Sequence, residues 1–253
     1  MQKIVYLVCC WCLCAAASVA QAPTPARSET EQRAIHALRR LTTAYQQPAY
    51  LGFDVLYRYA EEARPQKYLD SLRGQYKVHG GQFWSMLDSQ ETVSNSQLVL
   101  TVYREDQLLI LSKATAGGPP ASPLAMLDSF LVSNSANSYS YNNTPTEEVV
   151  SVQLPAGSPC KKMTWYIDRK TGYLRRMESL MRSDQLYEPA AQPLVTDAAS
   201  VYVVVETLYQ NYQTGQFGDE VFDLGKYYRK EGNEYIAQAP FEGYKVFLSS
   251  TGL

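Results

Sequence analysis

The sequence has few of the residues from which catalytic and metal sites are usually built. It holds two histidines and five cysteines, and four of the cysteines lie among its first fourteen residues. His36 and His79 are far apart, so with the remaining thiol they give no metal-ligand spacing. A nucleophilic role for Cys160 needs a basic partner and an electropositive setting. We therefore expect no catalytic residue, no metal and no cofactor, with a thiol enzyme acting through Cys160 as the alternative.

The sequence also lacks a basic excess and a membrane span. Without Lys3, 22 Lys and Arg residues stand against 25 Asp and Glu residues. A nucleic-acid surface needs clustered basic side chains, so no nucleic-acid partner is expected. The apolar stretch Ile4–Ala17 is shorter than the roughly 20 residues that a spanning helix requires. The chain is therefore not expected to span a membrane.

The first residues have the three parts of a signal peptide. Lys3 begins a short basic region, an uncharged apolar stretch follows, and Ala20-Gln21-Ala22 forms an A-x-A cleavage site. No cysteine of this segment follows a small residue, so lipidation is not expected. We predict a signal peptide over 1–22, with cleavage after Ala20 as an alternative, and a single β-rich domain over 23–253. The expected location is the periplasm of a Gram-negative-type envelope, with full secretion as the alternative.

What the sequence has in abundance is tyrosine, with 20 in all, a residue that suits pleated, half-buried surfaces. After Ser28, apolar residues at helical spacing predict one amphipathic helix that ends before Pro48. From Tyr50 the period changes to two, which predicts strands. The expected strands cover 50–59, 71–79, 82–88, 97–103, 107–112, 137–142, 146–154, 161–168, 173–182 and 199–212, and 219–249 holds a hairpin around Gly232-Asn233.

A second, short helix is expected within this series of strands. Ser122 is expected to cap this helix, and Pro123 takes its first position. The apolar residues that follow share one face as far as Val132. The elements together indicate an α+β protein in which antiparallel strands share one face with two helices.

The segment Met163–Glu178 is the most informative part of the chain. Its strand ends at Asp168, whose carboxylate can accept backbone hydrogens across a turn, and Gly172 supplies the left-handed position before the next strand. The run from Trp165 through Ile167-Asp168 to Lys170-Thr171-Gly172 resembles the strand–D-x-x-T-G–strand signature of the outer-membrane lipoprotein carrier (LolA-like) superfamily.

This resemblance implies a fold and a function. The fold is a half-open antiparallel β-barrel, or curved sheet, covered on its concave face by an N-terminal helix and a short inserted helix. The function is non-enzymatic binding of an apolar ligand, such as a lipid or the acyl chains of a lipoprotein, in a cavity between sheet and helices. No position matches the local motif of the carrier's gating arginine, for which Arg58, Arg104 and Arg176 are substitutes.

Six residues are expected to line this cavity, or else to pack against the helices as core: Tyr57, Trp84, Met86, Trp165, Leu127 and Phe130. An alternative function is that of an accessory subunit that docks on envelope proteins through the aromatic-rich segment Tyr227–Phe247. The short helix distinguishes a carrier from a plain structural domain. If it is a lid, polar residues at Leu127 and Phe130 should weaken ligand binding and leave much of the fold intact. If it is core, the same change should unfold the protein.

Overall fold

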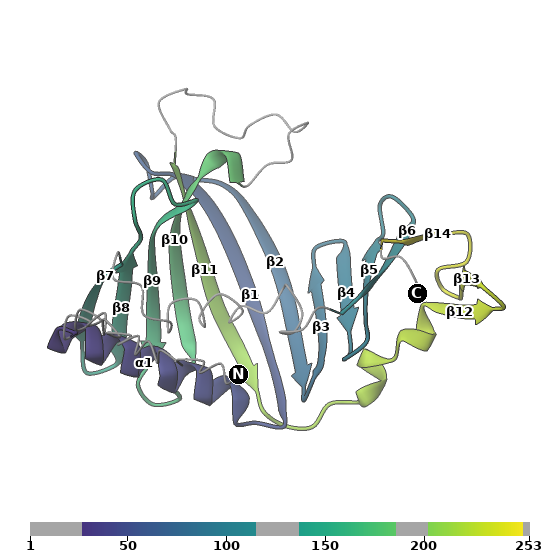
Figure 1. Ribbon diagram of the computed structural model, residues 1–253, viewed down its shortest axis with the longest axis horizontal. Coiled ribbons are helices and arrows are strands. Elements are labelled where there is room, and N and C mark those ends of the chain that lie inside the picture. Colours follow the sequence, from purple (N-terminus) through teal and green to yellow (C-terminus); the bar gives the residue numbers. More distant parts are fainter. Residues whose placement is uncertain (1–26, 115–136, 186–201, 250–253) are drawn as a thin grey trace, which may run out of the picture.

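The computed structural model describes residues 27–114, 137–185 and 202–249. Its main element is a curved, open sheet of twelve strands in the order β14-β6-β5-β4-β3-β2-β1-β11-β10-β9-β8-β7 (Figure 1). All neighbouring strands are antiparallel except β14 and β6. The strands are β1 (Tyr50–Glu61), β2 (Tyr68–His79), β3 (Gln82–Leu87), β4 (Gln90–Ser94), β5 (Leu98–Tyr103), β6 (Leu108–Lys113), β7 (Ser138–Asn143), β8 (Glu147–Gln153), β9 (Cys160–Asp168), β10 (Leu174–Arg182), β11 (Tyr202–Gln213) and β14 (Lys245–Leu248).

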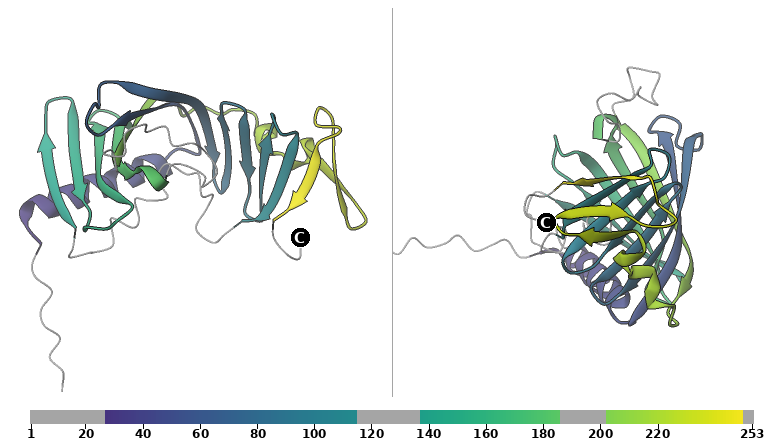
Figure 2. Two further views of the ribbon diagram at one scale, coloured as in Figure 1. Left: turned by 90° about the horizontal axis from the view of Figure 1, so that it is seen from above. Right: turned by 90° about the vertical axis from the view of Figure 1, so that its right-hand side faces the viewer.

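Helix α1 (Glu29–Gln46) begins as the sequence predicts. The Ser28 hydroxyl accepts a hydrogen bond from the Glu31 N–H at 3.2 Å, which satisfies one of the unpaired donors of the first turn. The predicted apolar stripe is buried and includes Ala34, Leu38 and Leu41. Figure 2 shows α1 lying inside the curve of the sheet. We call the side of the sheet that carries α1 the helix face.

Cross-strand register determines which side chains share the helix face, because paired residues project to the same side of a sheet. On β1, Phe53 and Val55 point to this face and pack with α1 in the first hydrophobic core. Phe53 pairs with Tyr76 of β2, and Val55 pairs with Tyr209 of β11. The alternation predicted from Tyr50 onward is therefore confirmed.

The opposite face of strands β3 to β6 carries a second hydrophobic core. Trp84, Val93, Leu100 and Leu111 form one cross-strand row there. The chain after β11 covers this row with buried side chains that include Phe222, Tyr227 and Phe241. That segment contains the short 3₁₀ turns η2 (Asp219–Phe222) and η3 (Leu224–Lys226) and the hairpin β12 (Tyr228–Glu231) and β13 (Glu234–Ala237). The sheet is thus covered on different faces in its two halves.

The structure confirms most of the predicted elements and corrects others. The hairpins around Gly80-Gly81 and Gly232-Asn233 are present. Strand β4 was missed, because Gln90–Ser94 is short and mostly polar. The expected interface aromatics Tyr227 and Phe241 are buried in the chain's own second core, so they are unavailable to a partner. The helix predicted over 122–132 lies outside the described residues.

Replacing Gly172 tests the predicted turn between β9 and β10. Gly172 has φ +75°, and an added Cβ would lie 3.2 Å from the Cβ of Ala44 on α1. We expect Gly172→Val to lower the free energy of unfolding by about 2 kcal/mol, because a β-branched residue is strained at this φ and crowds the helix. Gly157 has φ +86° with no atom near its added Cβ, so Gly157→Val is the matched control. If urea unfolding showed that both variants lose the same free energy of unfolding, the contact between this turn and α1 would be contradicted.

Candidate functional site

A continuous row of side chains crosses the helix face, one from each strand between β7 and β2. Each member is the register partner of the next, so all of them project to the same side. We call this set the central row, and its members are Tyr141, Val150, Trp165, Met177, Thr207, Tyr57 and Leu72. All but Thr207 are apolar or aromatic, so the row is an apolar track that runs across the strands.

Burial changes along the central row. Val150 and Trp165 are fully buried in the core on the β7–β9 side, where α1 packs against β7 and β8. Met177, Tyr57 and Leu72, on β10, β1 and β2, are only half-buried. The apolar track therefore passes from the fully buried core into a half-buried stretch, whose Met177 and Tyr57 pack at the margin of that core.

Thr207 lies in the middle of the half-buried stretch and is the polar exception. Its side chain is 0% exposed, and its Oγ1 has no hydrogen-bond partner among the described residues. The neighbouring hydroxyls differ, because Tyr57 and Tyr76 bond each other at 3.0 Å. Burial raises the pKa of both tyrosines, so both remain neutral at physiological pH. Thr207 is thus an unsatisfied polar group in an otherwise apolar track.

Aromatic side chains fill the space between the last turn of α1 and the sheet. Tyr45 of α1 contacts Phe53, Tyr173 and Tyr212 edge to face, with ring centroids 5.4 to 6.1 Å apart. The Tyr45 and Tyr212 hydroxyls are hydrogen-bonded, and the Tyr212 hydroxyl also donates to the Leu174 carbonyl at 2.9 Å. Burial raises the pKa of both tyrosines, so the cluster is uncharged. It anchors the C-terminal end of α1 to β10, β11 and β1.

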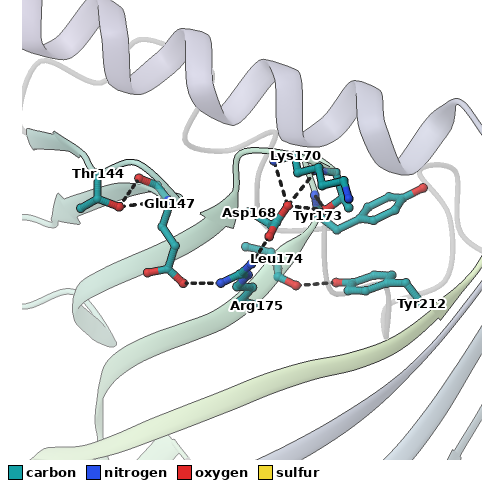
Figure 3. A network of polar contacts seen from close by, with 9 residues as sticks. Thr144, Glu147, Asp168, Lys170, Tyr173, Leu174, Arg175 and Tyr212 are labelled. Atoms are coloured by element: carbon teal, nitrogen blue, oxygen red, sulfur yellow. Dashed lines mark hydrogen bonds and ion pairs between the residues drawn. The ribbon is translucent and has the colours of Figure 1, made fainter.

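The D-x-x-T-G turn supports this anchor (Figure 3). Asp168 Oδ1 accepts hydrogen bonds from the Lys170 N–H at 2.9 Å, the Thr171 N–H at 2.8 Å and the Thr171 hydroxyl at 3.0 Å. Its other oxygen pairs with Arg175, which also pairs with Glu147 of β8. The motif therefore holds a hairpin beneath α1 and lies outside the central row.

The Asp168 network should make stability depend on pH. Burial opposes the charge of this carboxylate, but the Thr171 donors and Arg175 outweigh it and lower its pKa. In the unfolded chain the pKa of an aspartate is about 3.9. The stabilisation of the fold by the charged Asp168 carboxylate is therefore complete above about pH 4, and it is lost as the pH falls through the lower pKa of the folded state. We expect Asp168→Asn to be less stable than the wild type at about pH 7, with the difference shrinking towards about pH 2. If urea unfolding gave the same difference in stability between the wild type and Asp168→Asn at every pH, the charged Asp168 carboxylate would not be the stabilising group.

The predicted cavity residues separate between the two faces. Tyr57 and Trp165 lie together in the central row on the helix face. Trp84 and Met86 lie on the opposite face, because their register partners are Lys77 and Gln75, and both belong to the second core. Leu127 and Phe130 lie outside the described residues. Thr207 and Met177 were not predicted, although the alternation of β10 and β11 could have indicated them.

The three arginines considered as gating residues all lie on the face opposite α1. Arg58 and Arg176 both pair with Glu206 there, each at 3.5 Å, and Arg104 pairs with Glu91. A gate of a cavity beneath α1 has to reach the helix face, so none of these arginines takes that position. The substitutes suggested from the sequence are therefore wrong.

Metal and thiol chemistry depend on His, Cys, Asp and Glu side chains. The described residues contain no group of three or more His, Cys, Asp and Glu side chains that could hold a metal. Cys160 is buried, and burial raises the pKa of its thiol, which keeps it protonated and a poor nucleophile. Within the same ranges, no helix has the length and apolar character needed to cross a membrane.

No protein-family model and no curated protein sequence matches this chain. Solved structures similar to it include an uncharacterized conserved protein from Thermus thermophilus, with 10% identity, 86% of this chain and 99% of that chain covered, and a TM-score of 0.46. They also include a LolA superfamily protein from Nitrosomonas europaea, with 10% identity, 78% of this chain and 99% of that chain covered, and a TM-score of 0.35. A third is the Mycobacterium tuberculosis lipoprotein LppX, with 9% identity, 72% of this chain and 95% of that chain covered, and a TM-score of 0.34. The superfamily that the segment Met163–Glu178 resembles is thus among the similar structures.

Proposed function

We propose that this chain is a non-enzymatic binding protein for an apolar ligand, a lipid or the acyl chains of a lipoprotein. The ligand lies on the helix face along the half-buried part of the central row. The observation that carries this proposal is the change of burial along the row. Its side chains are fully buried on β8 and β9, at Val150 and Trp165, but only half-buried on β10, β1 and β2, at Met177, Tyr57 and Leu72. An apolar track with a few polar groups is typical of ligand sites.

We infer the place of action from the N-terminal segment. Residues 1–22 have the basic start, apolar stretch and A-x-A site of a signal peptide, and the remaining 23–253 are proposed to work as one domain in the periplasm. N-terminal sequencing of the protein from an envelope fraction should begin at Pro23 or Gln21. A chain that still begins at Met1 would overturn this location.

A fluorescent fatty acid tests the ligand site. Wild-type protein should bind it saturably, and Leu72→Glu should weaken binding at least about tenfold, because a carboxylate on the track must be desolvated against an acyl chain. Leu56→Glu is the matched control, since Leu56 of β1 is also half-buried but projects to the opposite face. Equal losses for the two variants, or no saturable binding by the wild type, would refute the proposed site.

A second candidate function is that of an interaction subunit of an envelope complex. It is favoured by Phe247 and Leu248, which are 54% and 46% exposed and are consecutive residues of the edge strand β14, one on each face. Exposed apolar residues on a sheet edge are typical of association surfaces. Native mass spectrometry of protein purified from its own envelope separates the candidates. Bound lipid supports the first, and a stoichiometric partner that is lost with Phe247→Asp supports the second.

A further inference from the structure

We propose that Thr207 is the polar anchor of the ligand site and that it selects acyl chains carrying a carbonyl group, an ester or an amide, over plain hydrocarbon. This inference rests on the proposed function and names the ligand chemistry of the same site. Thr207 is the one aliphatic side chain of the central row that carries a hydrogen-bonding group. A hydroxyl donates one hydrogen bond and accepts others, so it matches a carbonyl oxygen.

The unpaired state of Thr207 is the first reason for this assignment. Its Oγ1 is buried with no hydrogen-bond partner among residues 27–114, 137–185 and 202–249. Burying an unpaired hydroxyl is unfavourable, and valine has nearly the same shape without that cost. A threonine at this point is therefore poor for stability and suits a role in which a ligand group completes its hydrogen bonding.

The second reason is the surroundings of Thr207. Its register partners on the helix face are Met177 of β10 and Tyr57 of β1, both half-buried. The Tyr57 and Tyr76 hydroxyls are hydrogen-bonded to each other, whereas the Thr207 hydroxyl has no such partner among the described residues. Met177 has three rotatable bonds and can turn aside to admit a chain. An acyl chain on the track would place its carbonyl at Thr207 and its methylenes on the apolar neighbours.

The experiment compares Thr207→Val with Thr207→Ser. The probes are a pyrene-labelled alkane, the pyrene-labelled methyl ester of the same length and an N-acyl peptide with that chain. We expect Thr207→Val to lose about three- to tenfold in affinity for the ester, the acyl peptide or both, and to keep its affinity for the alkane. A loss confined to one carbonyl probe identifies the source of the ligand as lipid or acylated protein. Thr207→Ser, which keeps the hydroxyl, should bind as the wild type does.

Thermal unfolding without ligand gives an independent readout. Removing an unpaired buried hydroxyl should raise the Tm of Thr207→Val by about 2 to 4 °C. Ser94→Ala is the control, because the Ser94 hydroxyl is also buried and unpaired on the same face but lies four strands away on β4. The Ser94→Ala substitution should raise the Tm without changing the affinity for any of the three probes.

Three outcomes would overturn the inference. They are a lowered Tm for Thr207→Val, unchanged affinity of that variant for both carbonyl probes, and an equal loss for the alkane. These outcomes leave the proposed function standing, since the wild type still binds. If the wild type binds none of the three probes, the proposed function fails together with the inference.

Discussion

Replacing Trp165 with alanine is expected to lower the free energy of unfolding by about 3 to 5 kcal/mol. The Trp165 side chain is 1% exposed and is among the largest fully buried side chains of the described residues. Its register partners on the helix face are Val150 and Met177, so its removal leaves a void at the centre of the first core. The cost combines lost burial of the indole with the cavity that remains. Urea unfolding followed by circular dichroism measures it.

The adjacent residue supplies the control for Trp165→Ala. Tyr166 projects to the opposite face, where the Arg176 guanidinium lies 3.8 Å from its ring centroid and its hydroxyl bonds Glu178 at 3.1 Å. It is half-buried, so Tyr166→Ala should cost only about 1 kcal/mol. If Trp165 lined an open cavity, its replacement would cost no more than that of Tyr166. The difference between the variants therefore separates core packing at Trp165 from a ligand contact.

Replacing Glu91 with alanine is expected to cost about 3 kcal/mol and to loosen the C-terminal segment from the sheet. Glu91 is 6% exposed and accepts hydrogen bonds from Trp84 Nε1 at 2.8 Å and the Tyr227 hydroxyl at 2.7 Å. Its other oxygen pairs with Arg104. Burial and the bond to Glu91 raise the pKa of Tyr227, so this tyrosine stays a neutral donor. Alanine would leave two buried donors unpaired.

Hydrogen exchange measures where the Glu91→Ala variant loosens. The amides of β12 and β13 should exchange faster, while those of β9 and β10 should keep their protection. Glu91→Gln retains one acceptor oxygen and should have an intermediate stability. Glu105→Ala is the control, since Glu105 is an exposed carboxylate bonded only to Ser89 in the described network, and it should change stability by less than about 0.5 kcal/mol. A similar small loss for Glu91→Ala would contradict its role in joining the segment to the sheet.

Local features of the chain were predictable because their causes are local. The helix begins directly after Ser28 because the Ser28 hydroxyl caps its first turn, and its apolar stripe is set by residues three and four apart. The turn at Gly172 follows from the nearby Asp168 carboxylate and from a residue that adopts positive φ without strain. The alternation of β1 likewise follows from the period of a strand.

The assignment of faces was only partly accessible. The two-residue turn at Gly80-Gly81 pairs Val78 with Phe83, so Trp84 has to share the other face with Lys77. Both faces of that hairpin carry large apolar side chains, however, and alternation does not say which of them meets α1. Trp84 and Met86 were therefore expected beside Tyr57, although they lie on the opposite side.

By itself, the sequence determined the α+β class, the N-terminal helix, most of the strands and the D-x-x-T-G turn, because each depends on neighbours within a few residues. Only the tertiary structure decided that β4 joins the sheet, that Lys245–Leu248 pairs in parallel with β6, and that the C-terminal segment covers the face opposite α1. It also decided that Thr207 lies unpaired, within the described part of the chain, between Met177 and Tyr57. These features depend on register between strands far apart in the chain, and a periodic pattern within one strand carries no information about the strand with which it pairs.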